Sequence, residues 1–329
     1  ALVLTLMIQQ SIRLQQTMYI LWIDLATFFP RIDRRVSDIA DLLIGLPPEV
    51  QQLTRAIFSH QRGESVQCQY DSAAGLGVPF SNHMGRLMGD VLAPDQAKIL
   101  LNSVICAIRA TAKGVSLWGF TQLDASGRTQ VVAQLGYADD WAGVALSIEE
   151  VRIFWAVWTS WEMASGSKIG VKGLKKTVLS GVRFVDGRAD DAVDPRLPWQ
   201  GGFVPFMGKD GLYKYLGTWR CASGSSKGAW RERIKGFKAA VARVRQMYRP
   251  RPADFRMVSD ALIGGLGGHA GATDYLSWAM AEELERLYRS AYKKTHEGGH
   301  FPPSRTSAGL GTTVLDTAIA RPVPTARYV

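Results

Sequence analysis

Two adjacent aspartates, Asp139 and Asp140, lie in a short turn between two strand-like apolar segments, residues 129–135 and 141–146. This pattern predicts a β-hairpin whose tight turn carries the sequence Tyr-Ala-Asp-Asp. Neighbouring carboxylates repel one another, so placing them together is costly unless a cation neutralises them. A lone Asp-Asp pair can also be ordinary turn chemistry, because aspartate tolerates turn geometries and caps the segment that follows.

A third carboxylate, Asp24, ends the predicted strand over residues 18–24, which is rich in β-branched and aromatic residues. Phosphoryl transfer to a 3′-hydroxyl uses two metal ions about 3.5–4 Å apart, one at the attacking oxygen and one at the leaving pyrophosphate. Such a site needs an anchor from a second strand, and Asp24 is the candidate. Asp24, Asp139 and Asp140 are therefore candidates for catalytic ligands of two Mg²⁺ or Mn²⁺ ions, and the residues alone leave both this interpretation and ordinary turn chemistry open.

Helical patterns are expected elsewhere, up to about residue 16, over 94–113 and 148–163, and from 228 onwards. Residues 181–211 are rich in Gly and Pro and predict a long hairpin or loop, followed by a strand over 213–217. The expected fold class is α+β, with a small antiparallel sheet flanked by helices and a helical domain after it.

The formal net charge of +10 and the pI of about 9.6 favour a polyanionic partner, nucleic acid before anionic membrane. The three cysteines form no CxxC pair, which argues against a zinc ribbon or a disulfide-stapled secreted fold. The apolar residues 1–8 are too short to span a membrane and predict a buried helix face. No membrane partner is expected, and the compartment is predicted only as intracellular, nucleus or cytoplasm.

In their order and spacing, the motifs resemble those of reverse transcriptases of the non-LTR retrotransposon and group II intron type. Residues 21–30 are similar to the family's first metal-binding motif, and residues 137–140 match its catalytic turn. The resemblance implies that the backbone of Leu25 joins the three aspartates around the metal ions. It also implies that Phe29 stacks under the incoming sugar and excludes a ribose, although Phe29 fits plain core packing equally well.

Residues 85–94 resemble the second motif, with Gly89 and Pro94 in place and Met88 where the family has Gln. Residues 75–79 offer a competing alignment that lacks the Gln-Gly pair. The resemblance implies that Met88 and Gly89 contact the nucleotide, and that the Met88 departure affects efficiency or fidelity. It also places Lys176 near the triphosphate, although a loop lysine is often merely solvated.

The resemblance implies that Tyr137, Leu216 and Gly217 contact primer or template, the last two in a primer-grip turn. Residues beyond 221 form a strongly basic segment in which Arg231, Lys235 and Lys238 are expected to follow the phosphate backbone of a duplex. The predicted domains are a palm with partial fingers elements over 1–220, a helical basic thumb over 221–296 and a disordered tail over 297–329.

The predicted function is RNA-directed DNA polymerisation within a retrotransposon-like element, using an RNA template, a DNA primer and deoxynucleotide triphosphates. Only 23 residues precede Asp24, fewer than the family's fingers motifs require, so a fragment of a larger polyprotein and a decayed copy both stay open. The alternative function is a catalytically inactive fragment that only binds nucleic acid. A palm-type RNA polymerase is less favoured, because Phe29 is expected to exclude ribonucleotides.

Overall fold

The computed structural model describes residues 2–26, 28, 33–57, 66–68, 71–72, 75–76, 80–82, 93–111, 120–123, 129–132, 134–171, 176–246, 282–283 and 286–287. The chain forms two compact units, one of Gln15–Lys209 and one of Ala1–Leu14 with Asp210–Val329. The described residues contain six helices and a mixed sheet, so the predicted α+β class is confirmed. None of the described helices is both long enough and apolar enough to cross a bilayer.

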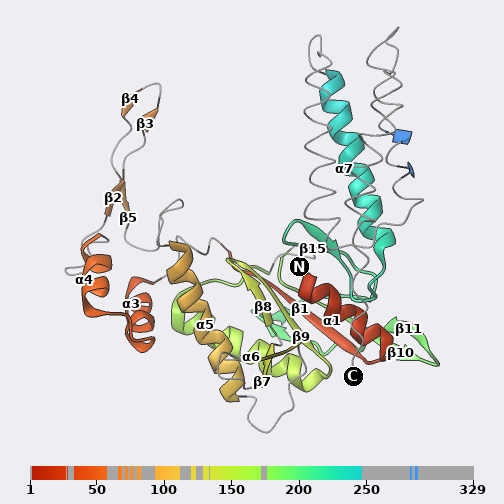
Figure 1. Ribbon diagram of the computed structural model, residues 1–329, viewed down its shortest axis with the longest axis horizontal. Coiled ribbons are helices and arrows are strands. Elements are labelled where there is room, and N and C mark those ends of the chain that lie inside the picture. The colour runs from red at the N-terminus through yellow and green to blue at the C-terminus, as the bar shows by residue number, and fades with distance from the viewer. Residues whose placement is uncertain are drawn as a thin grey trace. The chain divides into compact units, whose positions relative to one another are not determined.

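The unit of Gln15–Lys209 is built on a six-stranded sheet (Figure 1). Its strands are β1 (Met18–Asp24), β8 (Gln134–Tyr137), β9 (Asp140–Ala145), β10 (Val178–Val185), β11 (Arg188–Asp191) and β14 (Phe206–Met207). The main path runs β11-β10-β1-β9-β8 with antiparallel neighbours, and β14 pairs parallel with β10. Strand β1 is therefore central, with a hydrogen-bonded neighbour on each side.

Strand β1 is central because its sequence suits burial on both faces. All six residues from Met18 to Ile23 are buried, and strands buried on both faces have continuous apolar sequences rather than alternating ones. Tyr19, Leu21 and Ile23 belong to the main hydrophobic core. On the alternate face, the indole Nε1 of Trp22 donates a hydrogen bond to Ser180 Oγ at 2.9 Å.

Two helices, α5 (Ala93–Thr111) and α6 (Ile148–Ser165), lie side by side and supply the core beside the sheet (Figure 1). Trp158 of α6 is fully buried and makes edge-to-face contacts with Trp141 and Trp161. Ser147 caps the N-terminus of α6, and its hydroxyl accepts the Glu150 N–H, as N-cap residues do.

The remaining described elements of this unit lie outside the six-stranded sheet. They are α3 (Arg34–Leu43), α4 (Pro48–Ile57), β2 (Val66–Cys68), β3 (Asp71–Ser72), β4 (Gly75–Leu76), β5 (Phe80–Asn82), β6 (Phe120–Leu123), β7 (Thr129–Val132), β12 (Pro198–Trp199) and β13 (Gly202–Phe203). They pair as β2-β5, β3-β4, β6-β7 and β12-β13.

The second unit contains α1 (Leu2–Arg13), the hairpin of β15 (Tyr213–Tyr215) and β16 (Thr218–Arg220), and the long helix α7 (Ser226–Gln246). The hairpin turn places Leu216 at φ 48° and Gly217 at φ 77°. Left-handed backbone at both central positions is the geometry of a two-residue hairpin turn with the twist of its strands.

Most expected elements are present, with shifted ends. The predicted helix over 94–113 is α5, and the one over 148–163 is α6, which continues to Ser165. The prediction of one strand over 129–135 was wrong, because β7 pairs with β6 whereas β8 pairs with β9. The segment thus divides between two sheets. The predicted tail over 297–329 lies outside the described residues.

Candidate functional site

Asp24 and Asp140 lie directly opposite each other on neighbouring strands, as the last residue of β1 and the first residue of β9. Asp139 precedes Asp140 in the β8-β9 turn, which the Tyr137–Asp140 pair closes. The predicted hairpin therefore brings the adjacent aspartates to the end of the central strand, beside the third carboxylate.

The turn is held by a tryptophan that follows it. The Trp141 indole donates to the Ala138 carbonyl at 2.9 Å, and Ala138 has a left-handed φ of 53°. The Trp141 ring also lies across Gly136, where a Cβ atom would fall 2.3 Å from it. A glycine at 136 is thus required for the ring to reach the turn.

The turn is also tied to β1. The Leu25 N–H, one residue beyond Asp24, donates to the Asp139 carbonyl at 3.2 Å. Leu25 was predicted to contribute its backbone to the metal site, and its described role is to fix Asp139 beside Asp24.

The Asp24 backbone is held from the other side by the segment that precedes β10. Its N–H donates to Thr177 Oγ1 at 3.1 Å, and its carbonyl accepts the Gly170 N–H at 2.8 Å. The Thr177 N–H in turn donates to the Gly170 carbonyl at 2.8 Å. Thr177 is fully buried, so this small network fixes the Asp24 main chain away from water.

The Asp24 side chain forms an ion pair with Lys176. The Lys176 Nζ lies 2.9 Å from both Oδ1 and Oδ2 of Asp24. The side chain of Asp24 is 15% exposed and that of Lys176 is 46% exposed. The lysine therefore covers both carboxylate oxygens from the solvent side.

The carboxylates affect one another electrostatically. Burial raises the pKa of Asp140, and the negative charges of Asp139 and Asp24 raise it further, while the Lys176 ammonium lowers it. The neighbouring negative charges thus disfavour ionisation of Asp140, and a cation among the carboxylates relieves the repulsion.

Carboxylate oxygens are the donors that Mg²⁺ and Mn²⁺ prefer, so the chemistry of these residues fits such ions. As the side chains stand, no three acidic, histidine or cysteine groups in the described part of the chain converge closely enough to hold one ion. Both Asp24 oxygens face Lys176 instead. Metal ligation by all three aspartates would require Lys176 to release at least one Asp24 oxygen.

The structure thus brings together four predicted site residues: Asp24, Asp139, Asp140 and Lys176. Tyr137 belongs to the same turn and its side chain is exposed. Phe29, Met88 and Gly89 lie outside the described residues.

The other predicted nucleic-acid contacts belong to the second unit. Leu216 and Gly217 form the β15-β16 turn. Arg231, Lys235 and Lys238 lie on the exposed side of α7 and line a shallow groove of about 640 Å³ with Trp230. The Trp230 indole donates to Glu283 at 3.0 Å.

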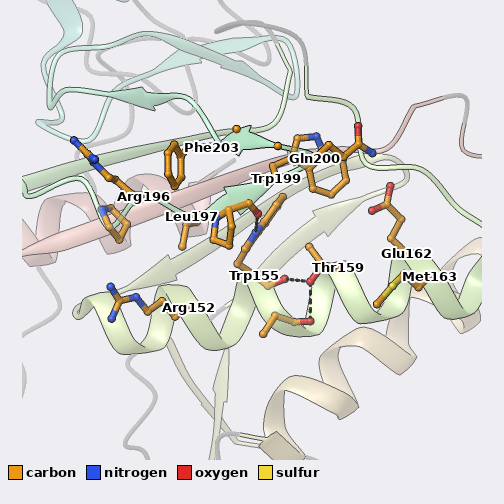
Figure 2. Close-up of a pocket in the computed structure, with 15 residues that line it drawn as sticks. Arg152, Trp155, Thr159, Glu162, Met163, Arg196, Leu197, Trp199, Gln200 and Phe203 are labelled. Atoms are coloured by element: carbon orange, nitrogen blue, oxygen red, sulfur yellow. Dashed lines mark hydrogen bonds between the residues drawn. The ribbon is translucent and has the colours of Figure 1, made fainter.

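A separate groove of about 1020 Å³ runs between α6 and residues 195–203 (Figure 2). Trp155 donates to the Pro198 carbonyl at 2.8 Å and packs edge-to-face on Trp199. Arg196 lies over the Phe203 ring. This groove contains none of the residues predicted for the site.

Sequence reasoning missed two residues that support Asp24, namely Gly170 and Thr177. Both fall near Lys176 in the sequence, where Lys176 alone was assigned a role. A buried threonine at a strand start resembles any β-branched strand residue, so the sequence carried no signal for its hydrogen bonds.

A scan against protein-family models finds no match, and a search of curated proteins finds none either. Among solved structures, the chain is similar to the telomerase of Candida albicans, solved in complex with the TWJ fragment of telomeric RNA. The two chains are 10% identical with a TM-score of 0.35, over 89% of this chain and 47% of the telomerase chain. This chain thus spans about half the length of that telomerase, and a TM-score of this size defines no family.

Proposed function

We propose that the chain is a template-directed nucleotidyltransferase that extends a primer 3′-hydroxyl, and in particular an RNA-directed DNA polymerase. The observation that carries the proposal is the meeting of Asp24 with Asp139 and Asp140 at the end of the central strand, with Lys176 beside them. Three carboxylates and one ammonium lie at the partly exposed end of the central strand. Such a set of groups suits a reaction between a metal-bound triphosphate and a hydroxyl.

In this proposal Asp24, Asp139 and Asp140 hold two divalent cations. Bound there, the ions supply an activated attacking oxygen and charge neutralisation on the leaving pyrophosphate. The hydrogen bond from Leu25 to Asp139 ties the β8-β9 turn to the end of β1, and the one from Gly170 holds the Asp24 backbone. Preorganised groups of this kind avoid reorganisation at the moment of reaction.

The basic side chains have supporting roles. Lys176, beside the aspartates, contacts the triphosphate of the incoming nucleotide. Arg231, Lys235 and Lys238 on α7 bind the phosphate backbone without reading sequence. Tyr137, exposed in the turn, contacts the primer or template.

The choice of RNA template and deoxynucleotides, and the setting in a retrotransposon-like element, rest on the motif resemblance. Phe29 is proposed to exclude the ribose 2′-hydroxyl, and Met88 and Gly89 to contact the nucleotide. The roles of Leu216 and Gly217 as a primer grip rest on the same ground.

Primer extension on an RNA template with deoxynucleotides and Mg²⁺ or Mn²⁺ tests the proposal. Asp139→Ala and Asp140→Ala are each expected to abolish extension. Asp190→Ala is the matched control, since Asp190 is an exposed aspartate of the same sheet, paired with Arg183 on β10.

Three other results are informative. Preferential incorporation of ribonucleotides would contradict the assignment to a DNA polymerase. Absence of extension together with intact, salt-sensitive binding to primer–template would favour the alternative, a fragment that only binds nucleic acid. Extension that survives in both aspartate variants would exclude these residues as the catalytic groups.

A further inference from the structure

We propose that Lys176 and a divalent cation compete for the Asp24 carboxylate, so that this lysine sets the affinity of the site for metal. The inference rests on the proposed role of the three aspartates as metal ligands. It assigns Lys176 a second task, distinct from contact with the triphosphate.

The geometry leaves one carboxylate to serve two cations. The Lys176 Nζ lies 2.9 Å from both oxygens of Asp24, so a single ammonium engages both acceptor atoms. A divalent cation shared with Asp139 and Asp140 needs at least one of those oxygens.

The backbone around Asp24 restricts the exchange to side chains. The Asp24 main chain is bonded to Thr177 and Gly170, and Thr177 fixes the start of β10 directly after the lysine. A Cβ atom on Gly170 would lie 2.8 Å from Asp24 Oδ2, so the loop is already in close contact there. Lys176, with 46% of its side chain exposed, can swing into water without disturbing any of these bonds.

The strength of the ion pair suits displacement. An ion pair this exposed is screened by water and shifts an equilibrium by only a few-fold. A divalent cation at three carboxylates therefore displaces the ammonium. Displacing it lowers the apparent metal affinity by the same few-fold factor. Removing the lysine is expected to tighten metal binding about two- to five-fold.

Mn²⁺ binding to the full chain, measured by titration calorimetry without nucleotide or nucleic acid, tests the inference. Lys176→Met keeps the aliphatic length and removes the charge, and it is expected to lower the Kd by about two- to five-fold. Lys176→Arg keeps a cation that can pair with Asp24, and it is expected to bind Mn²⁺ no more tightly than the original chain.

The matched control is Lys168→Met. Lys168 belongs to the same segment, and its carbonyl, not its ammonium, bonds Ala26. Its replacement removes the same charge and is expected to leave the Kd unchanged. Equal tightening by Lys168→Met and Lys176→Met would overturn the inference, because general electrostatics would then explain both.

The failure of the inference can be told apart from the failure of the proposed function. If the chain binds Mn²⁺, Asp139→Asn weakens binding and Lys176→Met has no effect, the competition is wrong while the metal site stands. If neither the original chain nor Lys176→Met binds Mn²⁺, the metal site itself is wrong, and the inference falls with it.

A second readout needs no variant. Linkage requires that a cation which releases Lys176 makes its amine more accessible, so saturating Mn²⁺ is expected to speed acylation of Lys176, read by mass spectrometry. Lys168 is the internal reference, with an unchanged rate. Equal labelling of Lys176 with and without bound Mn²⁺ would overturn the inference.

Discussion

Asp24 and Asp140 are Cα partners across two antiparallel strands, at the point where β1 ends and β9 begins. Like charges that face each other directly across strands destabilise a sheet. The pairing is therefore unfavourable for the fold by itself, which is a common property of residues selected for function. Backbone hydrogen bonds hold this region from outside: the Asp24 N–H donates to Thr177 Oγ1, and the Asp139 carbonyl accepts the Leu25 N–H.

Asp140→Asn is expected to stabilise the fold while abolishing extension. The substitution keeps the side-chain shape and removes one of three interacting negative charges, which is worth about 0.5–1 kcal/mol in the free energy of unfolding. Chemical unfolding in a chelator measures it. Asp190→Asn is the control, expected not to stabilise, because the Arg183 guanidinium holds the pKa of Asp190 below its usual value. Destabilisation by Asp140→Asn would contradict the electrostatic account.

Glu150→Gln is expected to change how stability depends on pH. Glu150 is buried and accepts the Leu146 N–H at 2.9 Å, and burial raises the pKa of its carboxyl. The contribution of protonated Glu150 to folding stability is fully present below the pKa of the unfolded state. It is lost as pH rises through the pKa of the folded state. The difference in unfolding free energy, variant minus original chain, should therefore be more favourable to the variant at pH 7 than at pH 4. Glu149→Gln, on the exposed side of the same turn, is the matched control, and identical profiles for both variants would contradict the prediction.

Gly170→Ala is expected to destabilise the chain by about 1–3 kcal/mol, the usual range for overpacking, and to impair extension. The new methyl group would lie 2.8 Å from Asp24 Oδ2 and 3.4 Å from the Asp24 carbonyl. Gly236→Ala is the contrast, since nothing lies within 4 Å of its Cβ position in α7. It should gain about 0.5–1 kcal/mol from helix propensity. Thermal unfolding compares the two variants. Unchanged stability of Gly170→Ala would show that the loop around Gly170 shifts to accommodate the methyl group.

Thr177→Val is expected to cost about 1–3 kcal/mol, because the buried Asp24 N–H would lose its acceptor. Extension should fall as well, since the Asp24 backbone loses one of its fixed points. Thr177→Ser keeps the hydroxyl and should restore most of the activity. Equal loss in both variants would indicate that the threonine methyl group, rather than its oxygen, is what matters.

Charge reversal at Arg231, Lys235 and Lys238 of α7 is expected to weaken binding to primer–template. The loss of affinity should be the same for every nucleic-acid sequence. Removing the contacts of Arg231, Lys235 and Lys238 should lower the slope of log K against log[salt] by about 0.7–0.9 per lost phosphate contact. A filter-binding series over salt concentration measures the slope. Arg188→Glu on β11 is the control for a general charge effect, since Arg188 is exposed and lies outside α7. A similar slope for both would argue against α7 as the contact surface.

The strand pairing at the site could be predicted from sequence because it depends on strong local patterns. The apolar run before Asp24 and the residues on either side of the aspartate turn have the composition of strands. The structure has β1, β8 and β9 there, although β8 is Gln134–Tyr137 and not the predicted 129–135. Their adjacency followed from chemistry, since one metal site would require all three aspartates. The class of fold needed only the alternation of helical and strand periods.

The supporting contacts could not be predicted. The bond from Asp24 to Thr177 joins residues 153 positions apart, and no local pattern encodes a pairing across that distance. The same holds for the Lys176–Asp24 ion pair. The motif resemblance implied a triphosphate contact for Lys176, and the structure has the Asp24 carboxylate as its partner. Residues 129–135 divide between two sheets because β7 pairs with β6 and β8 pairs with β9. The local sequence did not indicate these two pairings.

The hydrogen bonds of Gly170 and Thr177 to the Asp24 backbone have a consequence for the rate at which an ion could enter. If the proposed ions bind at these aspartates, the bonded main chain stays in place, and entry of an ion requires only side-chain movements of Asp24 and Lys176. Rotamer changes of exposed groups take picoseconds to nanoseconds, whereas lid and domain motions take microseconds or longer. The rate at which ions enter this site would then be governed by how quickly they shed water, and rapid-mixing experiments should find no slow conformational phase before the ion is bound.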